Sequence, residues 1–170
     1  ELAKQLLGRT YDVARPGVVA IYLTGSLPAG CGPHDVAIAL VGKLFKSGYV
    51  KNKVMEFVGP GIASLRQDTR NAIDAMTTET TCLSSIWETD ETTQKFLAVH
   101  GCAADYKKLA PADLAYYDGV VEVDLSAIRP MIALPMHPSN AFTIEELNAN
   151  LEDILHACEE DVQKLIGRKD

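Results

Sequence analysis

The 170-residue sequence contains no apolar run near the roughly 18 residues that a membrane-spanning helix needs. It also has no start typical of a secretory signal, in which a basic segment precedes an apolar one. Basic residues are few, since 16 Lys and Arg stand against 23 Asp and Glu and give a formal net charge of −7. Because nucleic acids and anionic lipids bind clustered positive charge, we expect neither a nucleic acid nor a membrane as a partner. These absences predict a cytoplasmic protein.

The sequence also lacks the common metal-binding motifs. Its cysteines are far apart without a C-x-x-C pair, and its histidines form no H-x-x-x-H or H-E-x-x-H pattern. This spacing favours free thiols and structural histidines, so we expect no metal bound by this chain alone. The residues concerned are Cys31, Cys82, Cys102, Cys158, His34, His100, His137 and His156.

Length and composition predict a single globular domain, because 47% of the residues are apolar and 23% are charged. A leading helical segment, residues 1–15, begins with glutamate and has no capping residue, which indicates an excised fragment or a processed product. The core is expected over residues 17–140. A long closing helix is expected over residues 143–166, because Thr143 and Glu146 form a capping box and apolar residues then recur every three or four positions.

Strand and helix patterns alternate along the core with short connections. The strands are expected at residues 18–23, 53–58, 82–87, 120–125 and 131–134, and the helices at 33–46, 64–76 and 90–100. Ser64 and Gln67 could form a capping box, and Asp90 or Thr89 could cap the next helix. This order predicts an α/β fold, a three-layer α/β/α domain with a mainly parallel or mixed sheet.

Two segments could contact a ligand on their residue types alone. The turn Gly59–Gly61, between a strand and a helix, is either a tight structural turn or a place where backbone N–H groups meet an anion. Neither G-x-G-x-x-G nor the P-loop pattern is present, which favours the structural turn. The hydroxyl-rich segment 77–82 surrounds Glu79. It could orient a polar group, or it could end a helix through hydrogen bonds from its side chains to the backbone.

Two further groups of residues have simple structural interpretations. Cys82 could act as a thiol nucleophile with His100 or His137 as its base, although no spacing supports this. The acidic residues before the helix at 90–100 are typical of a helix N-terminus, where negative charge is favoured. They are Glu88, Asp90 and Glu91.

Several motifs follow one another in a specific order. They are YLTGSLP at residues 22–28, Asp35-Val36, VMEFVGPG at 54–61, MTTE at 76–79 and VEVDLS at 121–126. This order resembles that of the aconitase family over roughly residues 1 to 140, and it is similar to the second α/β domain in the cluster-bearing part of those hydro-lyases. The segments MTTETTCLSS and VDLSAIRPMIALPMHPSN look closest to a bacterial branch of hydratases.

The resemblance implies that the full-length parent reversibly dehydrates and hydrates a hydroxy polycarboxylic acid, using a [4Fe-4S] cluster. In that family three cysteines hold the cluster, in a G-S-C-T-N segment and a C-x-x-C segment, and neither segment occurs here. The D-S-H motif of the family is also missing. The chain is therefore expected to be a framework domain that is inactive alone, binds no cluster itself, and has the remaining domains of the parent and a polycarboxylate substrate as partners.

One active-site residue of the family matches a residue here, namely the glutamate of M-x-x-E at Glu79. In the family this glutamate hydrogen-bonds an active-site histidine and holds it in the reacting tautomer. The chain departs from the family at Ala75, where Asn is common, and at 80–83, where x-G-A-[TK] is common. The alternative is a non-catalytic module of the same fold that binds an anion at Gly59–Gly61 or a protein along the closing helix.

Overall fold

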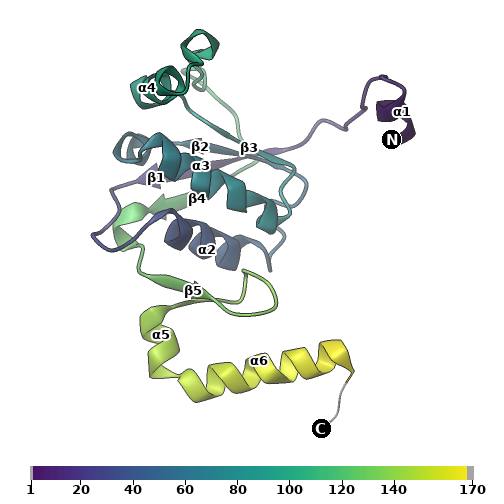
Figure 1. Ribbon diagram of the computed structural model, residues 1–170, viewed down its shortest axis with the longest axis vertical. Coiled ribbons are helices and arrows are strands. Elements are labelled where there is room, and N and C mark those ends of the chain that lie inside the picture. Colours follow the sequence, from purple (N-terminus) through teal and green to yellow (C-terminus); the bar gives the residue numbers. More distant parts are fainter. Residues whose placement is uncertain (1, 168–170) are drawn as a thin grey trace.

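The centre of the computed structural model, which describes residues 2–167, is a four-stranded parallel sheet (Figure 1). The strands lie in the order β3-β2-β1-β4, and each neighbouring pair runs in parallel. Their bounds are Val18–Thr24 (β1), Val54–Val58 (β2), Ser84–Trp87 (β3) and Gly119–Asp124 (β4). The expected α/β fold with a mainly parallel sheet is confirmed.

Helices α2 (Pro33–Leu44) and α3 (Gln67–Met76) connect β1 to β2 and β2 to β3, and they pack on the same face of the sheet (Figure 1). An antiparallel ribbon of β5 (Met131–Ala133) and β6 (Ala141–Thr143) packs beside α2. The other helices are α1 (Leu2–Leu6), α4 (Glu91–Val99), α5 (Ile144–Ala149) and α6 (Leu151–Ile166).

The register of the strands separates a buried face of the sheet from a partly exposed one. Ile21 pairs with Phe57, and Phe57 with Trp87. The side chains of Ile21 and Phe57 are fully buried in the core, and the Phe57 ring stacks on the Trp87 ring with centroids 4.0 Å apart. Neighbouring residues of a strand point to opposite faces, so Ile86 and Val120 lie on the other face. Their side chains are 44% and 56% exposed.

The closing helix differs from the expected single helix over residues 143–166. Asn150 leaves the helical conformation at φ −134° and ψ 36°, and this ends α5 just before α6 begins. The capping box is present, since the Glu146 N–H donates to Thr143 Oγ1 at 3.1 Å and the Thr143 N–H donates to Glu146 Oε2 at 2.8 Å. Helix α6 has no buried residue.

Neither α6 nor any other helix within residues 2–167 is long and apolar enough to cross a membrane.

Three other elements also differ from the expectation. Ser64 does not cap α3, because it lies in a 3₁₀ helix, Pro60–Ser64 (η1), and its hydroxyl donates to the Gly61 carbonyl at 2.7 Å. At the amino terminus, helix α1 covers only part of the leading segment, and Glu1 lies outside the described residues. The short strand β6 was not expected from the sequence, because three residues give too little alternation to be recognised.

The turn after β2 brings its backbone against β1. Gly59 has φ 105° and ψ 167°, a conformation that is essentially restricted to glycine. A Cβ atom on Gly59 would lie 2.6 Å from the Leu23 carbonyl oxygen, and one on Gly61 would lie 2.9 Å from the Leu23 carbonyl carbon. Both glycines are therefore required by close packing between the turn and β1.

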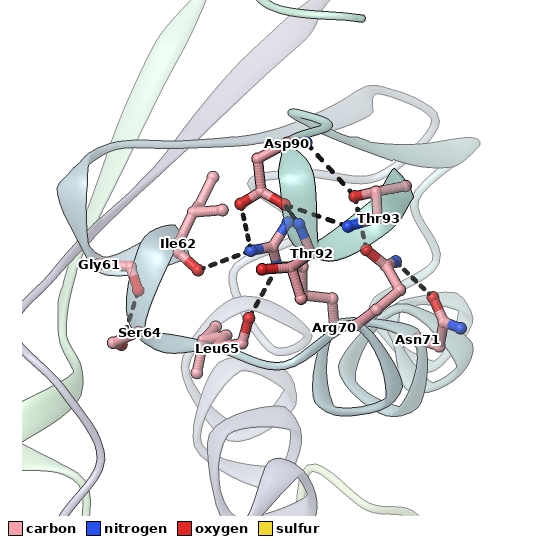
Figure 2. Close-up of polar contacts among 10 residues, drawn as sticks. Gly61, Ile62, Ser64, Leu65, Arg70, Asn71, Asp90, Thr92 and Thr93 are labelled. Atoms are coloured by element: carbon pink, nitrogen blue, oxygen red, sulfur yellow. Dashed lines mark hydrogen bonds and ion pairs between the residues drawn. The ribbon is translucent and has the colours of Figure 1, made fainter. Parts of the chain in front are cut away.

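The guanidinium of Arg70 joins the loops at the carboxyl end of the sheet (Figure 2). Its side chain is fully buried. Nε donates to the Leu65 carbonyl at 3.1 Å, while Nη2 donates to the Ile62 carbonyl at 3.0 Å and to Asp90 Oδ2 at 2.6 Å. Nη1 is buried without a hydrogen-bond partner among the described residues. Because a buried charge is costly unless it is paired, these contacts hold η1 and the start of α4 against α3.

Asp90 also caps α4, as expected from the sequence. Its Oδ1 accepts the backbone N–H groups of Thr92 at 2.9 Å and Thr93 at 3.2 Å. Burial raises the pKa of Asp90, but the Arg70 side chain and these two N–H groups outweigh burial, so the pKa lies below its ordinary value of 3.8. The ionised carboxylate therefore stabilises the folded state above pH 3.8, and this contribution is lost as the pH falls through the lowered pKa.

The substitution Gly59→Ala should lower the free energy of unfolding by roughly 2–5 kcal/mol, because it adds both backbone strain and a contact with Leu23. Gly30→Ala is the matched control. Gly30 has φ +88°, but a Cβ atom there would meet nothing within 4 Å. Strain alone should cost about 1 kcal/mol at that position. Urea unfolding, monitored by circular dichroism, measures both changes in the free energy of unfolding. Equal changes for the two variants would show that the close packing of Gly59 against β1 is unimportant.

The substitution Asp90→Asn should lower the free energy of unfolding by roughly 2–3 kcal/mol at neutral pH, because it leaves a buried guanidinium without its counter-charge. Asparagine caps helices about as well as aspartate, so the loss reports the ion pair. Asp68→Asn is the control, since Asp68 pairs with exposed Arg66 at 2.8 Å. It should cost less than about 1 kcal/mol. In urea titrations the difference between wild type and Asp90→Asn should shrink below pH 3.8. A constant difference down to acid pH would contradict the assignment.

Candidate functional site

The carboxylate of Glu79 projects from a 3₁₀ helix, Thr77–Thr80 (η2), which follows α3 and precedes β3. The Thr77 hydroxyl donates to the Asp74 carbonyl at 2.8 Å, and the Thr80 hydroxyl donates to the Thr77 carbonyl at 2.6 Å. Both threonines are buried, and Thr81 ends the turn with φ 63°. These hydroxyls complete the backbone of a helix end. The side-chain to backbone hydrogen bonds expected for segment 77–82 are therefore present, and the Glu79 side chain is left 45% exposed.

The imidazole of His137 lies next to this carboxylate. His137 belongs to the loop between β5 and β6, and its Nε2 is 3.6 Å from Glu79 Oε2. Its ring stacks on Phe45, the residue after α2, with centroids 3.9 Å apart. Its Nδ1 accepts the Ser139 backbone N–H at 3.1 Å. In the neutral ring the hydrogen is therefore on Nε2, the nitrogen that faces Glu79.

The pair formed by Glu79 and His137 is open to solvent on one side. The imidazole is 35% exposed, and the carboxylate forms no other hydrogen bond or ion pair with the residues that the structure describes. One edge of the carboxylate can therefore receive a second donor. A half-buried carboxylate and imidazole in contact are groups that enzymes use to hold and transfer protons. The sequence indicated Glu79 through its hydroxyl-rich surroundings and through the family resemblance, but no local pattern pointed to its contact with His137.

The sequence also left open a pair of Cys82 with His100 or His137, and the structure does not form it. The thiol of Cys82 contacts the Thr77 carbonyl at 3.3 Å. The Nδ1 atom of His100 lies 2.8 Å from the Phe96 carbonyl, and His137 faces Glu79. A thiol nucleophile activated by either histidine is therefore not supported.

The cysteines of the chain do not fit an iron–sulfur cluster. They belong to separate elements, and each thiol lies against a backbone carbonyl. Within residues 2–167, no three or more side chains of His, Cys, Asp or Glu are grouped so that they could hold a metal ion. The thiols are free and belong to Cys31, Cys82, Cys102 and Cys158.

The remaining candidates lie at the opposite, carboxyl edge of the sheet. The Gly59–Gly61 turn is tight and packs on the Leu23 backbone, which agrees with the structural interpretation. Asp90 is the N-cap of α4 and the partner of Arg70, so the acidic residues here have the expected role at a helix N-terminus. The structure therefore does not bring these residues together with Glu79.

Comparison with known proteins gives consistent matches. The model of the aconitase family (aconitate hydratase) matches residues 1–168. The 2,3-dimethylmalate dehydratase large subunit of Eubacterium barkeri is 30% identical over 132 residues, which is 78% of this chain and 31% of that protein. The 3-isopropylmalate dehydratase large subunit of Caldicellulosiruptor saccharolyticus is 31% identical over 136 residues, which is 80% of this chain and 31% of that protein.

Aconitate hydratase A of Thermus thermophilus is 30% identical over 156 residues, which is 84% of this chain but 17% of that protein. The chain thus spans a third or less of the length of these relatives. The family model nevertheless covers nearly every residue. On this evidence the chain belongs to the aconitase family.

Proposed function

We propose that this chain is a framework domain of an aconitase-like hydro-lyase, a cytoplasmic enzyme that reversibly removes water from a hydroxy polycarboxylic acid. The relatives act, by their names, on dimethylmalate, isopropylmalate and aconitate, which are all polycarboxylic acids. The free thiols suit a reducing compartment. The observation that carries the proposal is the carboxylate of Glu79, the residue that matches the family glutamate. This carboxylate is half-exposed and contacts the imidazole of His137.

Removal of water needs a group that accepts a proton from carbon and a group that protonates the departing hydroxyl. In this proposal Glu79 does neither directly. Its carboxylate accepts the N–H of the family's active-site histidine. The other nitrogen of that neutral ring then has a defined direction and a free lone pair that can accept a proton. The backbone that carries the carboxylate is held by the bond from Thr77 to Asp74 of α3 and by the bond from Thr80 to Thr77 within η2, which limits its movement.

In the proposed parent protein, the [4Fe-4S] cluster of the family would be held by residues outside this chain, because the four thiols described above do not fit it. The remaining domains would also cover surfaces that this chain leaves exposed. One is the sheet face with Ile86 and Val120, since parallel sheets are normally covered on both faces. The other is the apolar stripe of α6, which includes Leu155 and Leu165.

In the full-length protein, Glu79→Gln should lower kcat/KM roughly 10- to 100-fold, because the amide no longer provides a charged acceptor for the imidazole. Dehydration of malate-like and citrate-like acids can be followed by the ultraviolet absorbance of the alkene product. Glu122→Gln is the control, because Glu122 is exposed on edge strand β4, and its activity should match the wild type. Normal turnover by Glu79→Gln would refute the proposed role of Glu79.

The isolated 170-residue chain should show no hydro-lyase activity and no iron–sulfur absorbance after anaerobic reconstitution, because its cysteines are dispersed. The full-length protein treated in the same way is the positive control. Iron and sulfide analysis gives a second measure of cluster content. Stoichiometric iron and sulfide in the isolated chain would show that it binds a cluster, contrary to this proposal.

A further inference from the structure

We infer that His137 is a positioning residue for Glu79, and that it holds the carboxylate so that its second edge faces outward for another donor. This inference rests on the proposed function of Glu79. The two residues come from different parts of the chain, η2 and the loop between β5 and β6, and Nε2 of the imidazole is 3.6 Å from Oε2 of the carboxylate. The imidazole is itself held in one orientation by contacts with Ser139 and Phe45.

The first constraint on the imidazole is polar. Nδ1 accepts the backbone N–H of Ser139 at 3.1 Å, and the Ser139 hydroxyl lies 3.0 Å from the same nitrogen. A backbone N–H can only donate, so Nδ1 must be the acceptor and the hydrogen of the neutral ring must be on Nε2. Ser139 is 7% exposed, so bulk water competes little for this contact. The tautomer that can donate to Glu79 is therefore selected by the fold.

The second constraint is the packing of the ring on Phe45. The two centroids are 3.9 Å apart and the planes are inclined by 27°. Phe45 follows directly after α2, a helix that supplies several residues of the core, so the ring stacks on a rigid support. Stacking fixes the plane of the imidazole, and the Ser139 N–H fixes its rotation within that plane. Together they direct Nε2 at Glu79.

The third constraint acts on the loop that carries His137. The Leu134 N–H donates to the Asn140 carbonyl at 2.8 Å, and the Asn140 N–H donates to the His137 carbonyl at 2.8 Å. The Asn140 side chain donates to the Pro135 carbonyl at 2.9 Å, and Cys158 of α6 contacts the same carbonyl at 3.0 Å. The loop is thus closed on itself and attached to α6.

Two substitutions separate the donor role of His137 from its packing role. His137→Gln places an amide N–H near the position of Nε2 but loses the ring stacked on Phe45. His137→Phe keeps a stacked ring but loses the donor. If His137 positions Glu79, His137→Phe should lower kcat roughly 10- to 100-fold with little change in KM, and His137→Gln should keep most of the activity.

Both variants are tested in the full-length protein beside Glu79→Gln, with circular dichroism to verify the fold. Full activity of His137→Phe, or loss in His137→Gln alone, would overturn the inference and leave a packing role. If Glu79→Gln loses activity while His137→Phe keeps it, only this inference fails. If Glu79→Gln keeps activity, the proposed role of Glu79 fails, and the inference about His137 fails with it.

A second measurement does not depend on activity. In the 170-residue chain labelled with ¹⁵N, two-bond ¹H–¹⁵N correlation spectra at a pH where the ring is neutral report which imidazole nitrogen of His137 carries the hydrogen. We expect the hydrogen on Nε2, and a change in the Nε2 resonance in Glu79→Gln but not in Glu122→Gln. A hydrogen on Nδ1, or an unchanged Nε2 resonance in Glu79→Gln, would overturn the inference.

Discussion

The buried guanidinium of Arg70 is the interaction on which the arrangement of this domain most depends. Arginine stays charged at any pH at which the protein folds, so its complete burial must be matched by acceptors. The chain supplies them from two segments, the carbonyls of Ile62 and Leu65 after β2 and the carboxylate of Asp90 after β3. These segments can satisfy the charge only when β2, β3 and α3 have their observed relative positions. The ion pair therefore specifies an arrangement as well as stabilising it.

Helix α3 runs from the edge of the sheet where Arg70 is bound to the opposite edge, where Glu79 lies, so fixing the helix also fixes the position of Glu79. Arg70 lies in its first half, and Glu79 follows its last turn. Between them, Asp74 accepts the Ser85 hydroxyl at 2.6 Å and the Trp87 indole N–H at 2.9 Å, which joins the helix to β3. The helix is thus fixed at two levels, so the turn after it places Glu79 beside the loop of His137. Acid–base groups work best when rigid elements hold them in this way.

Much of the fold could be predicted from local patterns, because the interactions that form each element lie close together in the sequence. The apolar run of β1 and the N-cap Asp90 both appear in the structure. The prediction for Ser64 failed because a distant strand decided the outcome. Ser64 follows a turn that packs against β1, and its hydroxyl bonds within η1 instead of capping α3. The break at Asn150 interrupts an apolar periodicity that would otherwise predict one helix.

By itself the sequence determined an acidic α/β domain and, through motif order, its likeness to the aconitase family. It also singled out Glu79, because the M-x-x-E motif is contiguous and can be recognised without a structure. Only the tertiary structure decided which groups surround that carboxylate. His137 is distant in the chain, and its direction depends on Ser139, Phe45 and the packing of β5 and β6 beside α2. Contacts of this kind arise from the folding of the whole chain, so no local pattern records them.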